Sequence, residues 1–258
     1  MPSVSNPEPR FEVEAGTTTS TELDFISACA GYQQNQPPRS NLNPILISQK
    51  VRGEDSRVKQ SIVVLDLEGV LVPEIWIAVA EKTSIPDLRL TTRDIPDYDV
   101  LMRGRLKILD ERGLKLADIQ EVIGTLSPLP GGAEFLAELR SLTQVIILSD
   151  TFEEFAKPLM RQLGWPSILC HRLDITSEGR IAGYRLRQPD QKRKATHALK
   201  QLNYQVIAAG DSFNDTTMLA EADHGFLFHA PDNIRKQFPQ FKALDAYGDL
   251  LKEIKERL

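Results

Sequence analysis

The sequence predicts an α/β fold in which helices cover both faces of a doubly wound parallel sheet. Two observations support this prediction. Short apolar runs that are typical of buried strands alternate along the chain with longer segments of helical periodicity, and this alternation indicates βαβ units with right-handed crossovers. In addition, a helical segment of about 55 residues separates the first strand from the second. This segment has the size and position of an inserted cap.

The composition argues against several classes of protein. The 258 residues carry a formal net charge of −5 and no long basic cluster, so the chain lacks the footprint of a nucleic-acid-binding protein. The two cysteines, Cys29 and Cys170, lie far apart without metal-ligand spacing, which is typical of reduced thiols. No apolar run reaches the length of about 18 residues that a membrane span requires. We therefore expect a cytoplasmic protein with no nucleic-acid and no membrane partner.

Residues 1–58 differ from the rest of the chain. They hold six of the 16 prolines, several tracts of Ser, Thr, Asn and Gln, and little periodic apolar pattern. Such a segment buries too little apolar surface to offset its conformational entropy, so we predict a disordered N-terminal tail. The core domain is then expected to comprise residues 59–72 and 128–258, and the helical cap residues 73–127.

The first strand is predicted from the β-branched run Ile62 to Leu65, which stops at Asp66 and Glu68. Two carboxylates cannot ionise inside a dry sheet, so they must lie where the strand leaves it. In open α/β sheets, ligands bind outside the carboxyl ends of the strands. A reactive or metal-binding carboxylate pair and a plain acidic turn are both compatible with this segment by itself.

The inserted segment is predicted to contain three helices. An apolar stripe over 75–82 indicates the first helix. A polar, proline-interrupted loop over 91–99 leads into the second helix, which has Arg103 and Arg105 on or near its exposed side. The apolar residues within 118–123 suggest the third helix.

Helices and strands continue to alternate after the insertion. The predicted elements are a helix over 133–142, a strand over 145–148, a helix over 153–163, a strand over 167–170, a hairpin over 179–186, a helix from 192 to about 202, a strand over 205–209, a helix over 216–222, a strand over 225–228 and a final helix ending at 258. The helix from Lys192 is expected to bury Ala195, Ala198, Leu199 and Leu202. Together these elements predict a Rossmann-like sheet with an α-helical cap inserted after the first strand.

Polar side chains follow three of the predicted core strands. They are Asp66 and Glu68 after the first strand, Ser149, Asp150 and Thr151 after the second, and Asp211, Asn214 and Asp215 after the third, with Lys192 opening a nearby helix. Because the carboxyl ends of parallel strands share one edge of the sheet, we expect these groups to meet. Carboxylates that face one another repel unless a cation intervenes, and a ligand set of oxygens selects a hard ion such as Mg²⁺.

Lys192 and Ser149 suggest what such a site would do. Mg²⁺, a lysine and a serine hydroxyl are the groups that a transferring phosphoryl group requires, because all three stabilise negative charge on its oxygens. Alternatively, Ser149 and Asp150 only cap the following helix. Three such strand ends in one chain, together with the lysine, favour the chemical interpretation.

These residues resemble the motifs of the haloacid dehalogenase superfamily, within its phosphoserine-phosphatase-like group. Asp66 to Val70 matches the first motif, Ser149 the second, Lys192 the third and 210–215 the fourth. The helical insertion matches the cap of that group. More narrowly, the chain is similar to the subfamily of bifunctional phosphoserine phosphatases and homoserine phosphotransferases. The stretches that carry this narrower resemblance are 65–74, 91–99 and 208–219.

The resemblance implies a mechanism, a substrate and a set of binding residues. Asp66 attacks the phosphorus of O-phosphoserine to form an aspartyl-phosphate, Glu68 serves as general acid and base, and water or homoserine accepts the phosphoryl group. The implied binding residues are Glu74 for the substrate ammonium, Arg105 for its carboxylate, Ser149 and Lys192 for the phosphoryl oxygens, Thr151 and Asn214 as pocket lining, and Asp66, the Glu68 carbonyl, Asp211 and Asp215 for Mg²⁺.

Several alternatives stay open on the sequence. The alternative for Glu74 is an exposed acid in the first turn of a helix. The alternative for Arg105 is a position on a solvated helix face. The alternative functions are a phosphatase of the same fold for another small phosphate metabolite and a catalytically silent binding protein. Glu68 replaces the aspartate that is usual in the superfamily, and its extra methylene moves the carboxyl by roughly a bond length, which bears on how water is activated. A homo-oligomer is compatible with the sequence.

Overall fold

The computed structural model describes residues 59–91, 94–95 and 97–258. Residues 1–58, for which we predict a disordered tail, lie outside the described residues. The described part contains a seven-stranded sheet in the order β4-β3-β2-β1-β5-β6-β7, in which only β4 is antiparallel to its neighbour. The strands are β1 (Ser61–Leu65), β2 (Gln144–Phe152), β3 (Ser167–Ile175), β4 (Ile181–Arg185), β5 (Gln205–Gly210), β6 (His224–Phe228) and β7 (Lys242–Leu244).

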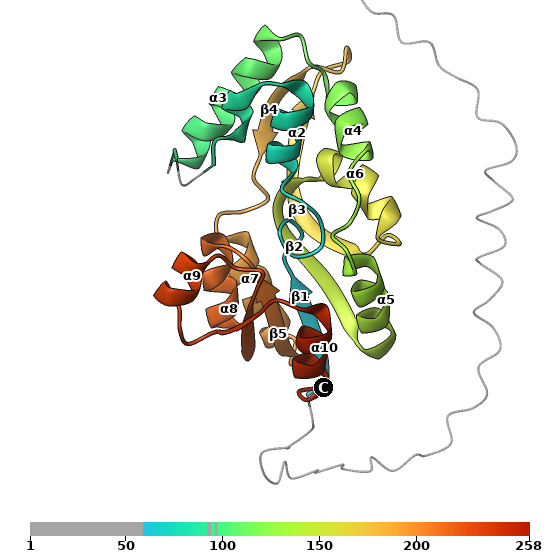
Figure 1. Ribbon diagram of the computed structural model, residues 1–258, viewed down its shortest axis with the longest axis vertical. Helices are drawn as coiled ribbons and strands as arrows, with labels where there is room; N and C mark the ends of the chain where they lie inside the picture. The colour runs from blue at the N-terminus through green and yellow to red at the C-terminus, as the bar shows by residue number, and fades with distance from the viewer. Residues whose placement is uncertain (1–58, 92–93, 96) are drawn as a thin grey trace, which may run out of the picture. The chain divides into compact units, whose positions relative to one another are not determined.

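Helices cover both faces of this sheet (Figure 1). They are α2 (Ile75–Thr83), α3 (Tyr98–Glu111), α4 (Leu116–Gly124), α5 (Gly132–Leu142), α6 (Glu153–Gln162), α7 (Gln191–Gln201), α8 (Thr216–Glu221), α9 (Asp232–Gln237) and α10 (Tyr247–Lys255), with the short 3₁₀ turns η2 (Pro86–Arg89) and η3 (Phe213–Asp215). Helices α5, α6 and α10 pack on one face, and α7, α8 and α9 pack on the other. The doubly wound α/β fold predicted from the sequence is confirmed.

Strand β1 lies at the centre of the sheet, and its side chains alternate between the two cores. Val63 and Leu65 belong to the core under α5, α6 and α10, whereas Ile62 and Val64 belong to the core under α7 and α8. This alternation explains why the strand is apolar at every position. Because β1 pairs in parallel with both β2 and β5, the carboxyl ends of these three strands lie side by side.

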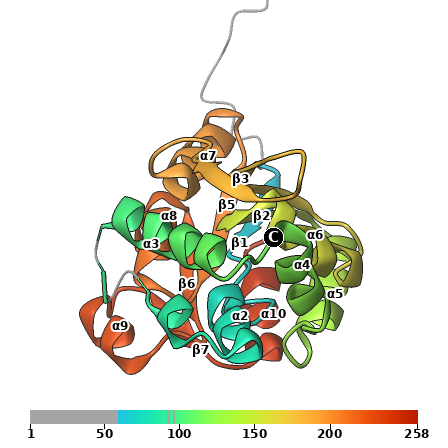
Figure 2. The ribbon, with the colours of Figure 1, turned by 90° about the horizontal axis from the view of Figure 1, so that it is seen from above.

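The segment between β1 and β2 is helical, as predicted. Figure 2 shows α2 and α3 lying across the carboxyl end of the sheet. The β3–β4 hairpin, which is far from α3 in the sequence, also contacts it: the Tyr184 hydroxyl on β4 donates to Asp99 Oδ1 on α3 at 2.6 Å. Among the described helices, none is long and apolar enough to cross a bilayer.

The observed strands are longer than the apolar runs that predict them. β2 continues through Ser149 to Phe152, and its pairing with β3 shifts register between Leu148 and Phe152. β3 continues to Ile175 because β4 pairs with its second half. In the β3 extension, polar residues such as Arg172 and Asp174 pair through their backbone with β4, which apolar patterning cannot reveal.

Two further features differ from the prediction. Helix α9 and strand β7 were not predicted, since six and three residues are too few for a periodic signal. In α7 the expected burial of Ala198 and Leu202 is wrong, because Ala198 is exposed and Leu202 is 69% exposed. The helix instead buries Lys192, Ala195 and Thr196, so its inner face holds the charged residue.

Candidate active site

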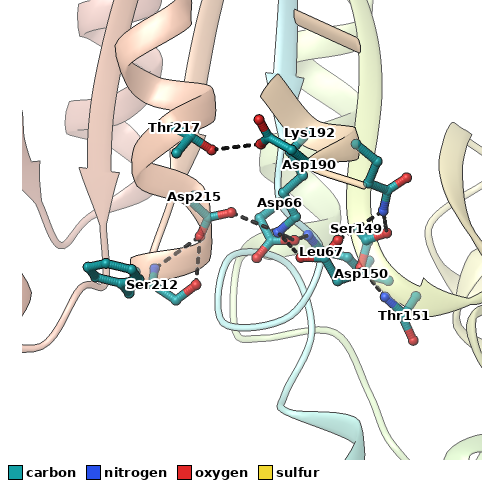
Figure 3. Close-up of polar contacts among 12 residues, drawn as sticks. Asp66, Leu67, Ser149, Asp150, Thr151, Asp190, Lys192, Ser212, Asp215 and Thr217 are labelled. Carbon is teal, nitrogen blue, oxygen red and sulfur yellow. Dashed lines mark hydrogen bonds and ion pairs between the residues drawn. The ribbon is translucent and has the colours of Figure 1, made fainter. Parts of the chain in front are cut away.

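Lys192 stands at the centre of the predicted cluster (Figure 3). It lies in the first turn of α7 and is only 4% exposed. Its Nζ lies 2.7 Å from Asp215 Oδ1, 2.8 Å from Asp66 Oδ1 and 3.8 Å from Asp150 Oδ2. Burial disfavours the charged amine, yet Asp215, Asp66 and Asp150 raise the pKa of Lys192 above its usual value. The lysine is therefore a buried cation that joins the ends of β1, β2 and β5.

Asp66 continues the β1 ladder by one residue before the chain leaves the sheet. Its backbone N–H donates to the Ala209 carbonyl at 3.0 Å, and its Oδ1 accepts the Leu67 N–H at 2.7 Å. Burial and the nearby Asp215 raise the pKa of the Asp66 carboxyl well above its usual value, against the opposing effect of Lys192. Hydrogen bonds thus hold Asp66 in place, and burial and the acidic neighbours disfavour its charged form more than Lys192 favours it.

A tight turn at Gly69 brings the loop after β1 against Asp211. Gly69 has φ +74°, and a Cβ built there would lie 2.4 Å from Asp211 Oδ2. The N–H of Gly69 also donates to the Val72 carbonyl at 2.8 Å, which closes the turn. Any side chain at this position would be strained and would displace Asp211. The loop after β1 therefore needs glycine at position 69 to lie this close to Asp211.

Asp215 organises the loop that follows β5. It is fully buried, and its Oδ2 accepts the N–H groups of Asp211 and Ser212 and the Ser212 hydroxyl, each at 3.0 Å. Since Oδ1 binds Lys192, both oxygens are engaged within the described residues. Asp215 thereby holds Asp211 and Lys192 in place from one carboxylate.

The acidic groups of the site fit a divalent cation. Asp66, Asp211 and Asp215 each offer a carboxylate oxygen, and these atoms lie within 4.8 Å of one another. Burial and Asp215 raise the pKa of Asp211 to about 8, against the opposing effect of Lys192. A hard cation with oxygen ligands would relieve this repulsion. The donor set therefore fits Mg²⁺, as the sequence predicts.

Ser149, Asp150 and Thr151 line the other side of Lys192, within β2. The Ser149 hydroxyl accepts the Thr151 N–H at 3.2 Å. The alternative that Ser149 and Asp150 cap the next helix is wrong, because α6 begins at Glu153 and has no side-chain cap. Ser149 and Thr151 are buried, while Asp150 is about a third exposed and faces the cavity.

Two residues that sequence reasoning missed hold Asp150. Gln191 Nε2 donates to Asp150 Oδ1 at 3.0 Å and to the Ser149 carbonyl at 2.5 Å. Buried His171 places Nε2 at 3.5 Å from Asp150 Oδ1, while its Nδ1 accepts the Arg187 N–H at 3.1 Å. Despite burial, Lys192 and these hydrogen bonds hold the pKa of Asp150 below its usual range. The only sequence feature that pointed to Gln191 was its position next to Lys192. The scattered spacing of the histidines gave no signal for His171.

Glu68 lies between the strand ends and the inserted helices. Its Oε2 accepts the N–H of Ile75, the first residue of α2, at 2.8 Å. Burial, and then the neighbouring Glu74, raise its pKa to about 7, although hydrogen bonds from Ile75 and Thr151 oppose the shift. A carboxyl with a pKa near neutrality can both give and take a proton. Exposed Glu74 lines the same cavity.

Arg105 is buried, contrary to the expectation that it lies on the exposed side of its helix. It is 7% exposed, its Nη2 donates to the Leu90 carbonyl at 2.6 Å, and its guanidinium lies 4.5 Å from the centre of the Trp76 ring. Burial lowers its pKa to about 10. Within the described residues it has no carboxylate partner, and its Nε has no hydrogen bond. Arg103, two residues earlier, is the exposed one and pairs with Asp99.

The predicted site residues share one cavity of about 300 Å³ between the strand ends and the inserted helices. Those that line it are Asp66, Glu68, Glu74, Arg105, Ser149, Thr151, Lys192, Asp211 and Asn214. Asp215 lies behind them. The lining also includes Trp76 and Tyr98, which the sequence did not single out because apolar residues in a helical pattern are usually core.

Proteins of a known family resemble this chain in sequence. Residues 61–223 match the model of the haloacid dehalogenase-like hydrolases. The chain belongs to this family. It is 66% identical over 189 residues to the phosphoserine phosphatase ThrH of Pseudomonas aeruginosa, covering 73% of this chain and 92% of that protein. A phosphoserine phosphatase of Pseudomonas syringae pv. tomato is also 66% identical over 189 residues, covering 73% of this chain and 80% of the relative.

Solved structures support the fold of this hydrolase. A phospho-aspartyl intermediate analogue of a phosphoserine phosphatase aligns with a TM-score of 0.63 at 19% identity, covering 76% of this chain and 99% of that chain. A phosphoserine phosphatase from T. onnurineus aligns with a TM-score of 0.58 at 22% identity, covering 78% and 98%. At these identities the likeness establishes the fold alone.

Proposed function

We propose that this hydrolase is a Mg²⁺-dependent phosphoserine phosphatase that works through an aspartyl-phosphate on Asp66. The observation that carries the proposal is a cavity lined by two cations. Lys192 lies beside Asp66, and Arg105 has no carboxylate partner in the described residues. A phosphorylated amino acid has an anion at each of its own ends. The name of the two relatives at 66% identity supports the same substrate.

In the first step Asp66 attacks the phosphorus in line, and the bond to the serine oxygen breaks. Glu68, with its pKa near 7, donates its proton to that oxygen, so serine leaves as a neutral alcohol. Ser149 and Lys192 donate hydrogen bonds to the phosphoryl oxygens. Asp66, the Glu68 carbonyl and Asp211 would hold Mg²⁺, with Asp215 in support, and the ion would add positive charge against the phosphoryl oxygens.

In the second step the ionised Glu68 takes a proton from the acceptor hydroxyl. The acceptor oxygen attacks the phosphorus, and the bond to Asp66 breaks to restore the free carboxylate. Water as acceptor gives inorganic phosphate. We propose that the homoserine hydroxyl is a second acceptor, since homoserine carries the same ammonium and carboxylate as serine, for which Glu74 and Arg105 are available.

The choice of acceptor can be measured directly. In a reaction with phosphoserine and Mg²⁺, added homoserine is expected to yield phosphohomoserine while inorganic phosphate falls by the same amount, because both acceptors compete for one phosphoenzyme. The two products are quantified by ³¹P NMR. Butanol at equal concentration serves as the control, since it has the hydroxyl without the charged groups. If only inorganic phosphate forms at all homoserine concentrations, transfer to homoserine is excluded.

Arg105 is proposed to bind the substrate carboxylate. Arg105→Ala is expected to raise the KM for phosphoserine by about 10²-fold, the size of a lost charge-assisted pair, and to change the KM for 4-nitrophenyl phosphate less than threefold. Steady-state kinetics on both substrates test this. Arg103→Ala is the matched control, because Arg103 is exposed on the same helix. Equal effects of Arg105→Ala on both substrates would exclude the role.

Further assignments remain proposals. Thr151 and Asn214 line the pocket as expected of substrate contacts. The division into core and cap, a cytoplasmic location and a homo-oligomeric state remain predictions from the sequence.

A further inference from the structure

The guanidinium group of Arg105 lies over the ring of Trp76. The indole lies on α2, is 9% exposed and lines the cavity, and the Arg105 guanidinium carbon lies 4.5 Å from its ring centre. A guanidinium donates hydrogen bonds within its own plane. An aromatic ring on its face therefore binds the cation without occupying the edge that a carboxylate would use.

Few other contacts fix the guanidinium plane. Its hydrogen bonds within the described residues are one to the carbonyl of Leu90 and one long contact of 3.7 Å to Met102 Sδ, while Nε has none. Leu90 lies in a loop and is partly exposed. The Leu90 carbonyl is the only oxygen among the described residues that accepts from the guanidinium, so the Trp76 ring is the other close contact available to set its plane.

Trp76 is itself held by the core. Its ring meets Phe155 of α6 edge-on at 5.3 Å, and Phe155 meets Phe152 edge-on at 5.7 Å. Both phenylalanines are fully buried. Phe152 ends β2, directly after Ser149, Asp150 and Thr151. A packed aromatic row thus runs from the strand that lines the phosphoryl end to the ring beneath Arg105, and such interlocked rings resist displacement.

We propose that Trp76 is a positioning residue that sets the plane of the Arg105 guanidinium, and that it thereby makes the enzyme prefer phosphate esters that carry a carboxylate. This inference rests on the proposed phosphoserine phosphatase activity. Trp76 acts only through Arg105, so its removal should affect recognition of the carboxylate and leave transfer of the phosphoryl group intact.

The test compares two substrates that differ by that carboxylate, O-phosphoserine and O-phosphoethanolamine. Trp76→Leu is expected to raise the KM for phosphoserine about three- to thirtyfold, the range for loss of a partly desolvated cation–π contact, with kcat and the KM for phosphoethanolamine changed less than twofold. Trp76→Phe, which keeps an aromatic face, should restore most of the preference. Trp165→Leu is the matched control, because the other tryptophan of the chain is 60% exposed and lies outside the cavity.

Fluorescence gives a second readout that needs no substitution of Trp76. In Asp66→Asn/Trp165→Leu protein, Trp76 is the sole tryptophan. Phosphoserine is expected to change the emission of Trp76, because its carboxylate pairs with the Arg105 guanidinium that lies over the ring. Phosphoethanolamine, which has no carboxylate, is expected to leave the emission unchanged. This measurement decides the matter even if Trp76→Leu fails to fold.

The outcomes separate failure of the proposed phosphatase function from failure of the proposed role of Trp76. If the unchanged enzyme does not hydrolyse phosphoserine, the proposed function falls and the inference falls with it. If it does, but Trp76→Leu raises both KM values equally, or both ligands change the emission equally, only the positioning role is overturned. Failure of Trp76→Phe to restore the preference would also overturn the positioning role of the aromatic face.

Discussion

Asp66→Asn is expected to lower phosphoserine turnover by about 10⁴-fold or more, the scale seen when a covalent nucleophile is removed. The amide is nearly isosteric with the carboxylate, so the hydrogen bond from the Leu67 N–H can persist. Its oxygen lacks the charge needed to attack phosphorus, and the amide also weakens the ion pair with Lys192. The substitution therefore removes the chemistry while keeping the backbone of the site.

Two measurements check this result. Steady-state phosphate release gives the turnover, and acid quenching with ³²P-labelled phosphoserine gives the fraction of enzyme that carries a covalent phosphoryl group. Both should vanish in Asp66→Asn. Asp110→Asn is the matched control, because Asp110 is an exposed acid that pairs with Arg180 away from the cavity. Appreciable turnover by Asp66→Asn, or a labelled intermediate in it, would rule out Asp66 as the nucleophile.

Lys192→Met should have the largest effect on stability. Methionine keeps most of the length of the side chain but leaves Asp66 and Asp215 buried without their cation. Removal of one partner from a buried ion pair costs roughly 3–5 kcal/mol. We expect a loss of this size in the free energy of unfolding without divalent cations, and a smaller loss with Mg²⁺, because a bound cation would neutralise the same carboxylates.

Urea unfolding in EDTA and in excess Mg²⁺ measures the loss in the free energy of unfolding without and with the divalent cation. Turnover should also fall by several orders of magnitude, since Lys192 is proposed to hold the phosphoryl oxygens. Lys194→Met controls for helix propensity and net charge, as Lys194 is exposed on the same helix. A Lys192→Met protein as stable in EDTA as Lys194→Met would contradict the account of Lys192 as the cation that the acidic cluster requires.

The end of β1 was predictable because the local sequence determines it, whereas β2 continues to Phe152, past its predicted end at 148. A buried β-branched strand such as Ile62 to Leu65 must stop where Asp66 begins, and the parallel order then brings its end beside those of β2 and β5. Lys192 was expected near these strand ends because it opens a helix nearby, and its Nζ lies 2.8 Å from Asp66 Oδ1. These features depend on burial alternation and on the right-handed crossover, both of which are readable from one chain.

The environment of Arg105 was not predictable in the same way. On a helical pattern Arg103 and Arg105 are equally typical of a solvated face. Which of them is buried depends on what packs across α3, namely Trp76 and the carbonyl of Leu90, and neither contact is local in sequence. His171 and Gln191 behind Asp150 escaped prediction for the same reason, since they approach it from β3 and α7.

The arrangement of β2, β1 and β5 as immediate neighbours has a consequence for how the enzyme can diversify. Adjacent strands lie about 4.8 Å apart because peptide hydrogen bonds set that spacing. The lateral separation of Ser149, Asp66 and Asp211 is thus inherited from the backbone ladder and is insensitive to most side-chain replacements. The helices between β1 and β2 carry no such constraint. Substitutions that change the substrate are therefore expected to accumulate in that inserted segment, while the spacing of the groups at the phosphoryl end stays constant.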